Sequence, residues 1–165
     1  MANLDYANGF TFRRSLDGEA VILEATAGAV ALKKGDAVYM TVGTLLLAVQ
    51  DSTAIYGIMA EDCVASATDA KFYPALPTYV FEVQTYSVTP FVFASHTNFT
   101  CDLIGGTGAM ELNLGDADSD QFLVWKLADS NPTAEPSVVG ANANVYCTIL
   151  MSQFLGQVDT LTVHA

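Results

Sequence analysis

Short apolar runs, separated by turn residues, are the feature that most restricts how this chain can fold. The runs are rich in Val, Ile, Thr, Tyr and Phe, which favour strands, and Gly, Asp, Asn or Pro separates them. No window of about twelve residues places apolar side chains at the i, i+3, i+4, i+7 spacing of an amphipathic helix. The pattern predicts an all-β protein with short antiparallel strands and one helical turn near residues 151–155. The expected strands are 19–25, 37–42, 45–49, 55–60, 79–86, 89–94, 100–104, 110–114, 121–127, 145–151 and 160–163.

Turn sequences lie between these segments. Asp17-Gly18 precedes an apolar run and is a strong hairpin signal, and residues 33–36 form a second turn. Tight loops are expected at 42–44 and 105–108, because glycine supplies the positive φ values that such loops need. The stretch 131–136, which contains two prolines, is expected to be an exposed loop.

The 165-residue length suits one domain of ordinary size. We expect a single β-barrel or sandwich, or two small stacked β-modules. Residues 1–18 form either an extended N-terminal arm or a first strand, and residues 19–165 form the β-domain, with 19–94 and 95–165 as alternative sub-modules. Segments 35–62 and 100–129 share the order strand, glycine loop, strand, acidic segment, strand, which indicates an internal repeat.

Charge excludes several functional classes. The chain has 18 Asp+Glu against 6 Lys+Arg, a net charge of −12, with 52% hydrophobic residues. A nucleic-acid partner needs a basic surface that so few cations do not easily build, and the apolar content argues against disorder. The apolar run 37–49 is interrupted and too short to span a membrane, so no membrane partner is expected. Lys126 is the only cation after residue 71, so the C-terminal half is the more acidic.

Residues able to carry catalysis are few. His96 lies in a predicted loop and His164 near the C-terminal end, and no GxSxG sequence accompanies them. The 105–108 glycines lack the Lys-Ser/Thr of a phosphate-binding loop. We therefore expect no enzyme, no catalytic residue and no cofactor.

Metal-binding patterns are equally weak. Asp116, Asp118 and Asp120 have the spacing that hard cations favour, but the glycine and glutamate of an EF-hand loop are missing, so a loosely bound Ca²⁺ and an exposed acidic turn both stay open. The cysteines are odd in number and lack zinc spacing, which favours small buried side chains over a disulfide framework. They are Cys63, Cys101 and Cys147. No metal site is expected.

The segment from Phe10 to Arg14 alternates aromatic and polar residues and ends in two arginines. It is competent to add a strand to a neighbouring subunit, with Phe10 and Phe12 in pockets and Arg13 and Arg14 meeting acidic groups. The alternative is an ordinary first strand of its own sheet. These four residues are the candidate contacts with a partner.

Several segments follow one another in a recognisable order along residues 19–151. They are Lys34-Gly35-Asp36-Ala37-Val38, Ile55-Tyr56-Gly57-Ile58, Val64-Ala65-Ser66-Ala67, Pro77-Thr78-Tyr79-Val80-Phe81-Glu82-Val83, Cys101-Asp102-Leu103 and Phe122-Leu123-Val124. This order resembles tailed-bacteriophage head decoration proteins, also called capsid cement or stabilisation proteins.

The resemblance implies a virion structural protein on the capsid exterior, assembled in the host cytoplasm. Its partners would be the major capsid protein and further copies of itself, with a trimer favoured over a dimer. The charge distribution suggests that the N-terminal half faces the shell and the acidic half faces solvent.

Two other functions stay open. A glycan- or receptor-binding β-sandwich of a phage fibre or adhesin requires an exposed aromatic platform, for example Tyr73, Tyr79 or Tyr86. A small hydrolase on a β-scaffold would use His96.

Overall fold

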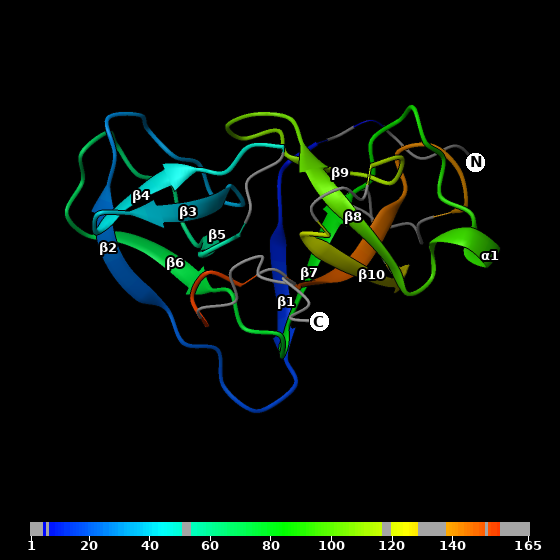
Figure 1. The fold of residues 1–165 in the computed structure, drawn as a ribbon, viewed down its shortest axis with the longest axis horizontal. Helices are drawn as coiled ribbons and strands as arrows, with labels where there is room; N and C mark the ends of the chain where they lie inside the picture. Colours follow the sequence, from blue (N-terminus) through cyan, green and yellow to red (C-terminus); the bar gives the residue numbers. More distant parts are fainter. Residues whose placement is uncertain are drawn as a thin grey trace, which may run out of the picture.

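The chain is all-β in the computed structural model, which describes residues 5, 7–50, 54–116, 120–128, 138–150 and 152–155. A closed barrel of five strands lies beside a six-stranded antiparallel sheet, and one short helix, α1 (Phe93–His96), completes the fold (Figure 1). The fold class expected from the sequence is therefore confirmed. Among the described residues, no helix has the length and apolar character needed to cross a membrane.

The barrel has the strand order β2-β4-β3-β5-β6 and is antiparallel except for the pair β2–β4. Val42 and Gly43 have φ values of 47° and 76°, so a tight turn joins β3 to β4, as predicted. The strands are β2 (Leu23–Ala27), β3 (Ala37–Thr41), β4 (Thr44–Leu47), β5 (Gly57–Met59) and β6 (Ala70–Pro74).

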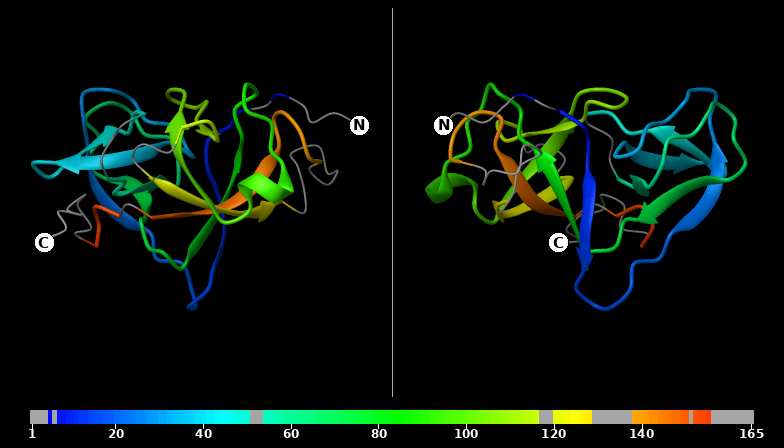
Figure 2. Two further views of the ribbon diagram at one scale, coloured as in Figure 1. Left: turned by 45° about the vertical axis from the view of Figure 1, so that its right-hand side comes forward. Right: turned by 180° about the vertical axis from the view of Figure 1, so that it is seen from behind.

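The larger sheet has the order β1-β7-β11-β10-β8-β9. Its first strand comes from the N-terminal segment, which crosses between the barrel and the rest of the sheet (Figures 1 and 2). The strands are β1 (Thr11–Ser15), β7 (Tyr79–Gln84), β8 (Phe99–Ile104), β9 (Glu111–Asn113), β10 (Phe122–Leu127) and β11 (Asn144–Ile149).

One apolar core cluster joins the two sheets, and a second cluster lies within the barrel around Phe72. The shared cluster includes Ile55 and Ile58 from the barrel and Phe81 and Val145 from the larger sheet, with Phe10 of the N-terminal segment among them. The change from one sheet to the other falls at residues 75–78, whereas the sequence placed its sub-module boundary at residue 94. Because the core is shared, the two β-modules stabilise each other.

The repeat expected between 35–62 and 100–129 is present in the topology. In each segment the first strand is central and pairs with the second and third, as β4-β3-β5 and as β9-β8-β10. The correspondence extends to five strands, because β6 and β2 continue the first order as β11 and β7 continue the second. The contact between the first and last strands of each order corresponds as well. In the barrel β2 runs parallel to β4, and in the larger sheet Thr85, just after β7, forms a parallel bridge with Leu112 of β9.

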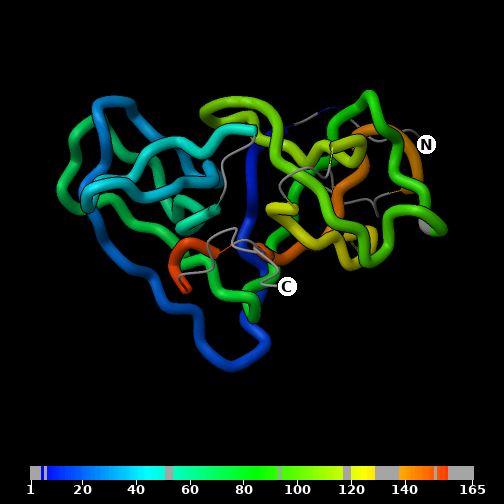
Figure 3. The backbone as a smooth tube through the Cα atoms, in the orientation of Figure 1, coloured from blue at the N-terminus to red at the C-terminus, as the bar shows by residue number. Residues whose placement is uncertain are grey.

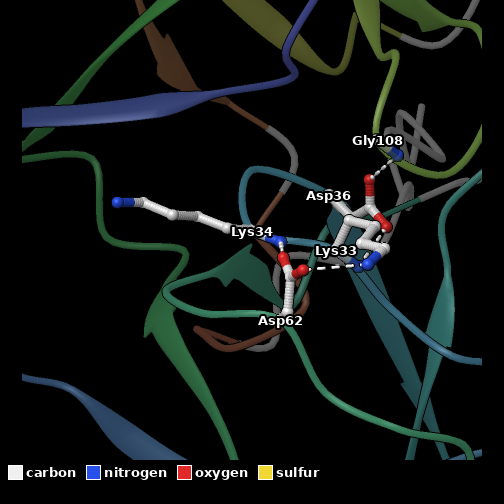
Figure 4. A network of polar contacts seen from close by, with 5 residues as sticks. All are labelled: Lys33, Lys34, Asp36, Asp62 and Gly108. Atoms are coloured by element: carbon white, nitrogen blue, oxygen red, sulfur yellow. Dashed lines mark hydrogen bonds and ion pairs between the residues drawn. The ribbon is translucent and has the colours of Figure 1, made fainter.

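Asp36 fastens the barrel to the larger sheet. Its carboxylate accepts the backbone N–H of Lys33 (Oδ2, 2.8 Å) and that of Gly108 in the β8–β9 loop (Oδ1, 2.7 Å; Figure 4). The next residue, Ala37, donates its N–H to the sulfur of Met110 at 3.0 Å. Asp36 is fully buried, and that burial raises the pKa of its carboxyl group above the usual value, although the two N–H donors act in the opposite direction.

Three sequence predictions differ from the structure. Residues 89–94 were expected as a strand, but the segment ends in α1, where the N–H of Val92 is bonded to the side chain of His96. The Asp17-Gly18 sequence is not a hairpin: it lies in the projecting loop that joins β1 to β2 of the other sheet (Figure 3). Strand β6 was not predicted, although its residues alternate between buried and half-buried positions.

Other expectations concern chain ends and loops. Near 151–155, where one helical turn was expected, Ser152 bridges Ile55 and residues 153–155 form a turn, while residue 151 lies outside the described residues. Segments 131–136 and 160–163 lie outside the described residues.

Candidate functional site

A β-bulge places two arginines on the same face of the larger sheet. In the β1–β7 pair, Phe12 lies opposite Phe81 and Arg14 opposite Val80, so Arg13 is the extra residue. Phe12 packs against the core, whereas Arg13 and Arg14 both line the opposite, outer face. A regular strand would send consecutive side chains to opposite faces, and the bulge removes that alternation.

Strand β10 contains a second β-bulge, in its pairing with β11. Val124 lies opposite Cys147 and Lys126 opposite Tyr146, so Trp125 is the extra residue. Val124 belongs to the core, while Lys126 lines the outer face. The indole N–H of Trp125 donates to Oγ1 of Thr148 at 3.2 Å. The two bulges thus bring side chains from β1 and β10 together across β7 and β11.

These side chains form a cationic pocket of about 240 Å³, lined by Arg13, Arg14, Val80, Lys126 and Tyr146. It gathers three of the six Lys and Arg residues of a chain whose net charge is −12. The pocket therefore concentrates positive charge on a protein that is otherwise strongly acidic.

Glu82 fixes one of the arginines. Its side chain is 4% exposed, and its Oε2 lies 2.7 Å from Nε and 2.6 Å from Nη2 of Arg13. Its other oxygen accepts the Asn144 Nδ2–H at 3.2 Å. A buried carboxylate is stable only when paired in this way, so Arg13 is committed to Glu82 and its charge is balanced.

The other two cations of the pocket differ in their surroundings. The Nζ of Lys126 lies 5.5 Å from the ring centroid of Tyr146, within cation–π range. Arg14 is exposed, and its side chain has no hydrogen bond or ion pair with any residue that the structure describes. Its guanidinium group is thus available to an external anion.

The structure separates the four predicted contact residues into two pairs. Arg13 and Arg14 lie in the pocket, on the surface. Phe10 is 2% exposed and stacks on Phe122, with ring centroids 4.7 Å apart, and Phe12 stacks on Tyr73 at 4.5 Å. Phe10 is buried and Phe12 is half-buried against the core of its own molecule, and the segment that follows Phe10 pairs with β7 as the first strand of the larger sheet.

Lys126 was not predicted as a site residue. The sequence contained one indication that Lys126 has a special role, because it is the only Lys or Arg in the acidic C-terminal half. Its approach to Arg14 depends on the order β1-β7-β11-β10, which no local sequence pattern encodes.

Other predicted sites have structural roles in the described residues. His96 ends α1, where its Nδ1 accepts the N–H of Val92 at 2.9 Å, and burial lowers its pKa. Tyr79 is buried, and its hydroxyl oxygen accepts the N–H of Val21 at 2.7 Å. With Tyr73 stacked on Phe12, neither of these two tyrosines provides the platform expected of a glycan-binding face.

The metal candidates give a similar result. Asp116 is hydrogen-bonded to Gln50, and Asp118 lies outside the described residues. Within the described part of the chain, no three His, Cys, Asp or Glu side chains gather as metal ligands would. Cys101 and Cys147 are free thiols in the core, where burial raises their pKa values, and Cys63 is also free.

Comparison with known proteins gives no assignment: no protein-family model matches the sequence, and no curated protein matches it significantly.

Glu111 on β9 is expected to make the stability of the protein depend on pH. One of its carboxyl oxygens is buried without a hydrogen-bond partner, and burial, together with the nearby Asp5, raises its pKa from 4.5 to about 7. The folded protein therefore holds this proton more tightly than the unfolded chain, so stability falls as the pH rises from about 4.5 to about 7. We expect Glu111→Gln to be more stable than the wild type by about 1 kcal/mol at alkaline pH, allowing for solvent screening, and the gap to shrink in acid.

Urea unfolding across this pH range measures the effect. Glu19→Gln makes the same charge change at an exposed position and serves as the control. A gap between Glu111→Gln and wild type that does not grow with pH would contradict the prediction.

Proposed function

We propose that this protein is a virion structural protein that binds the outer surface of a mature tailed-phage capsid and stabilises it by bridging major capsid subunits. The observation that carries the proposal is the cationic pocket, which gathers Arg13, Arg14 and Lys126 on an acidic molecule. Such a surface docks in one orientation, because the rest of the protein repels an acidic partner.

The surroundings of the pocket support an interface. Strand β1, which supplies Arg13 and Arg14, leads into the projecting β1–β2 loop, where Leu16, Val21 and Ile22 are about half exposed. Apolar side chains next to paired and unpaired arginines are typical of protein interfaces. The contact face thus draws on the N-terminal segment, as the charge distribution suggested, but also on Lys126 from the acidic half.

Stabilisation of the shell follows from selective binding. A protein that binds the expanded lattice more tightly than its precursor shifts the equilibrium towards the expanded form by mass action. A closed homo-oligomer, with a trimer favoured, would engage several capsid subunits at once and gain avidity from the repeated contact.

Co-sedimentation with undecorated phage heads tests the proposal. The wild-type protein is expected to pellet with expanded heads and to bind unexpanded procapsids more weakly. The double variant Arg14→Glu/Lys126→Glu replaces attraction by repulsion at the pocket, so we expect its affinity for expanded heads to fall about 100-fold. The matched control is Lys34→Glu/Lys71→Glu, which makes the same charge change on the barrel and is expected to bind like the wild type.

Each result has a separate meaning. Binding to neither particle would refute the proposed function, and equal binding to both would remove its dependence on maturation. Equal loss in the two double variants would show that net charge matters rather than the pocket.

A further inference from the structure

We infer that the pocket binds a carboxylate of an acidic peptide segment and that Arg14 is the residue that grips it. The inference rests on the proposed function for the source of the segment, an Asp or Glu side chain on the outside of the shell. The chemistry of the pocket itself is argued from the side chains that line it.

The arrangement of charges selects Arg14. Arg13 is already occupied by Glu82, at 2.6 Å, so its fork of N–H donors is directed into the sheet. Arg14 carries the same planar fork and has no partner among the described residues. A guanidinium group of this kind binds a carboxylate through two parallel hydrogen bonds, which gives both strength and orientation.

The remaining lining residues suit the rest of an acidic side chain. Lys126 also lines the pocket, beside the ring of Tyr146. The partly exposed Tyr146 ring offers apolar surface to the methylene groups of a glutamate. A volume of about 240 Å³ accommodates one such side chain with its neighbouring backbone, and not a large ligand.

The charge of the whole protein disfavours nucleic acid, and the titration below compares the peptide with inorganic phosphate. A nucleic acid requires a basic track along several phosphates, whereas this protein carries a net charge of −12. An acidic peptide segment is therefore the ligand that the charges favour.

Trp125 provides a built-in reporter. It is the only tryptophan of the chain, and its indole N–H is bonded to Thr148 on the same face as Lys126, its neighbour in the β10 bulge. The indole resonance in a ¹H–¹⁵N spectrum of the full chain is therefore a single peak next to the pocket.

The experiment is a titration of that spectrum, at low ionic strength, with a blocked tetraglutamate peptide. We expect a saturable shift of the Trp125 indole peak, and no shift with a blocked tetralysine peptide. Arg14→Gln should weaken binding at least tenfold, while Arg14→Lys, which keeps the charge but loses the fork, should lie in between. The control is Lys34→Gln, because Lys34 belongs to the barrel and does not line the pocket. This variant should bind the peptide like the wild type.

Several results would overturn the inference. Inorganic phosphate binding as tightly as the peptide would show that the pocket is a general anion site. No difference between Arg14→Gln and Lys34→Gln, with both variants folded by circular dichroism, would remove Arg14 from the interaction. If capsids bind but Arg14→Gln does not weaken that binding, the proposed function stands and the inference fails. If the peptide binds as described and capsids do not, the pocket chemistry stands and the proposed function fails.

Discussion

Replacing Phe10 by alanine is expected to reduce the free energy of unfolding by about 3–5 kcal/mol, the range observed when a buried aromatic side chain is truncated. Phe10 is among the largest fully buried side chains, stacked on Phe122 and packed edge-on against Phe81, with ring centroids 6.5 Å apart. The truncation leaves a cavity in the core that the two sheets share. Single domains are stable by only about 5–15 kcal/mol, so the variant loses a large part of its stability.

The same substitution also affects the pocket. The N–H of Phe10 donates to the carbonyl of Gly35 at 2.8 Å, which fixes the chain just before β1. Gly35 has φ of +87°, and a Cβ atom there would lie 2.8 Å from the Asn8 carbonyl oxygen, so only glycine permits this approach. Loss of the Phe10 ring loosens this anchor, and with it the position of Arg14.

Urea unfolding measures the effect, with Leu16→Ala as the control because Leu16 is 52% exposed on the projecting loop. The control is expected to change stability by less than about 0.5 kcal/mol. If Phe10→Ala cost no more than the control, the N-terminal segment would not be part of the core, and the geometry of the pocket would lose its support.

The strand pattern was sufficient to predict the fold class. Apolar side chains at alternate positions mark buried strand faces, and β7 illustrates this: Tyr79, Phe81 and Val83 all enter the core. The tight turn at Val42-Gly43 and the shared strand order of the two repeated segments were likewise predictable, because both are encoded within a few tens of residues.

Pairing between distant strands was not predictable, and the pocket depends on it. Arg13 meets Glu82, which is 69 positions away, only because β1 joins β7. Sequence alone could suggest that Arg13 and Arg14 contact something, but a regular strand would have placed them on opposite faces. The bulge that unites them is a property of the register between two strands, and that register is fixed by the burial of Phe12 and Phe81.

The pocket and the core are therefore linked through β1. One face of this strand supplies an aromatic side chain to the core, and the other supplies the arginines to the surface. A rigid core beneath the site holds the guanidinium groups in place before a partner arrives, which lowers the entropic cost of binding.

Asp36→Ala is expected to cost about 2–3 kcal/mol, because it removes the acceptor of two backbone N–H groups, those of Lys33 and Gly108. Neither group gains another acceptor from an alanine side chain. Asp36→Asn should lie between alanine and wild type, since its amide offers a single oxygen and places an NH₂ group against the second donor. Urea unfolding of the wild type, Asp36→Asn and Asp36→Ala at neutral pH measures their order of stability.

Asp62→Ala is the matched control. Asp62 also bonds twice to the same turn, to Nζ of Lys33 at 2.8 Å and to the backbone N–H of Lys34 at 2.9 Å, but it does so at the surface (Figure 4). Water replaces those bonds when the side chain is removed, so its loss should be much the smaller of the two. The comparison contrasts a buried carboxylate that also reaches the β8–β9 loop with an exposed one that bonds only to the turn. Equal losses in the two variants would mean that neither the burial of Asp36 nor its bond to Gly108 contributes to stability, and would contradict the prediction.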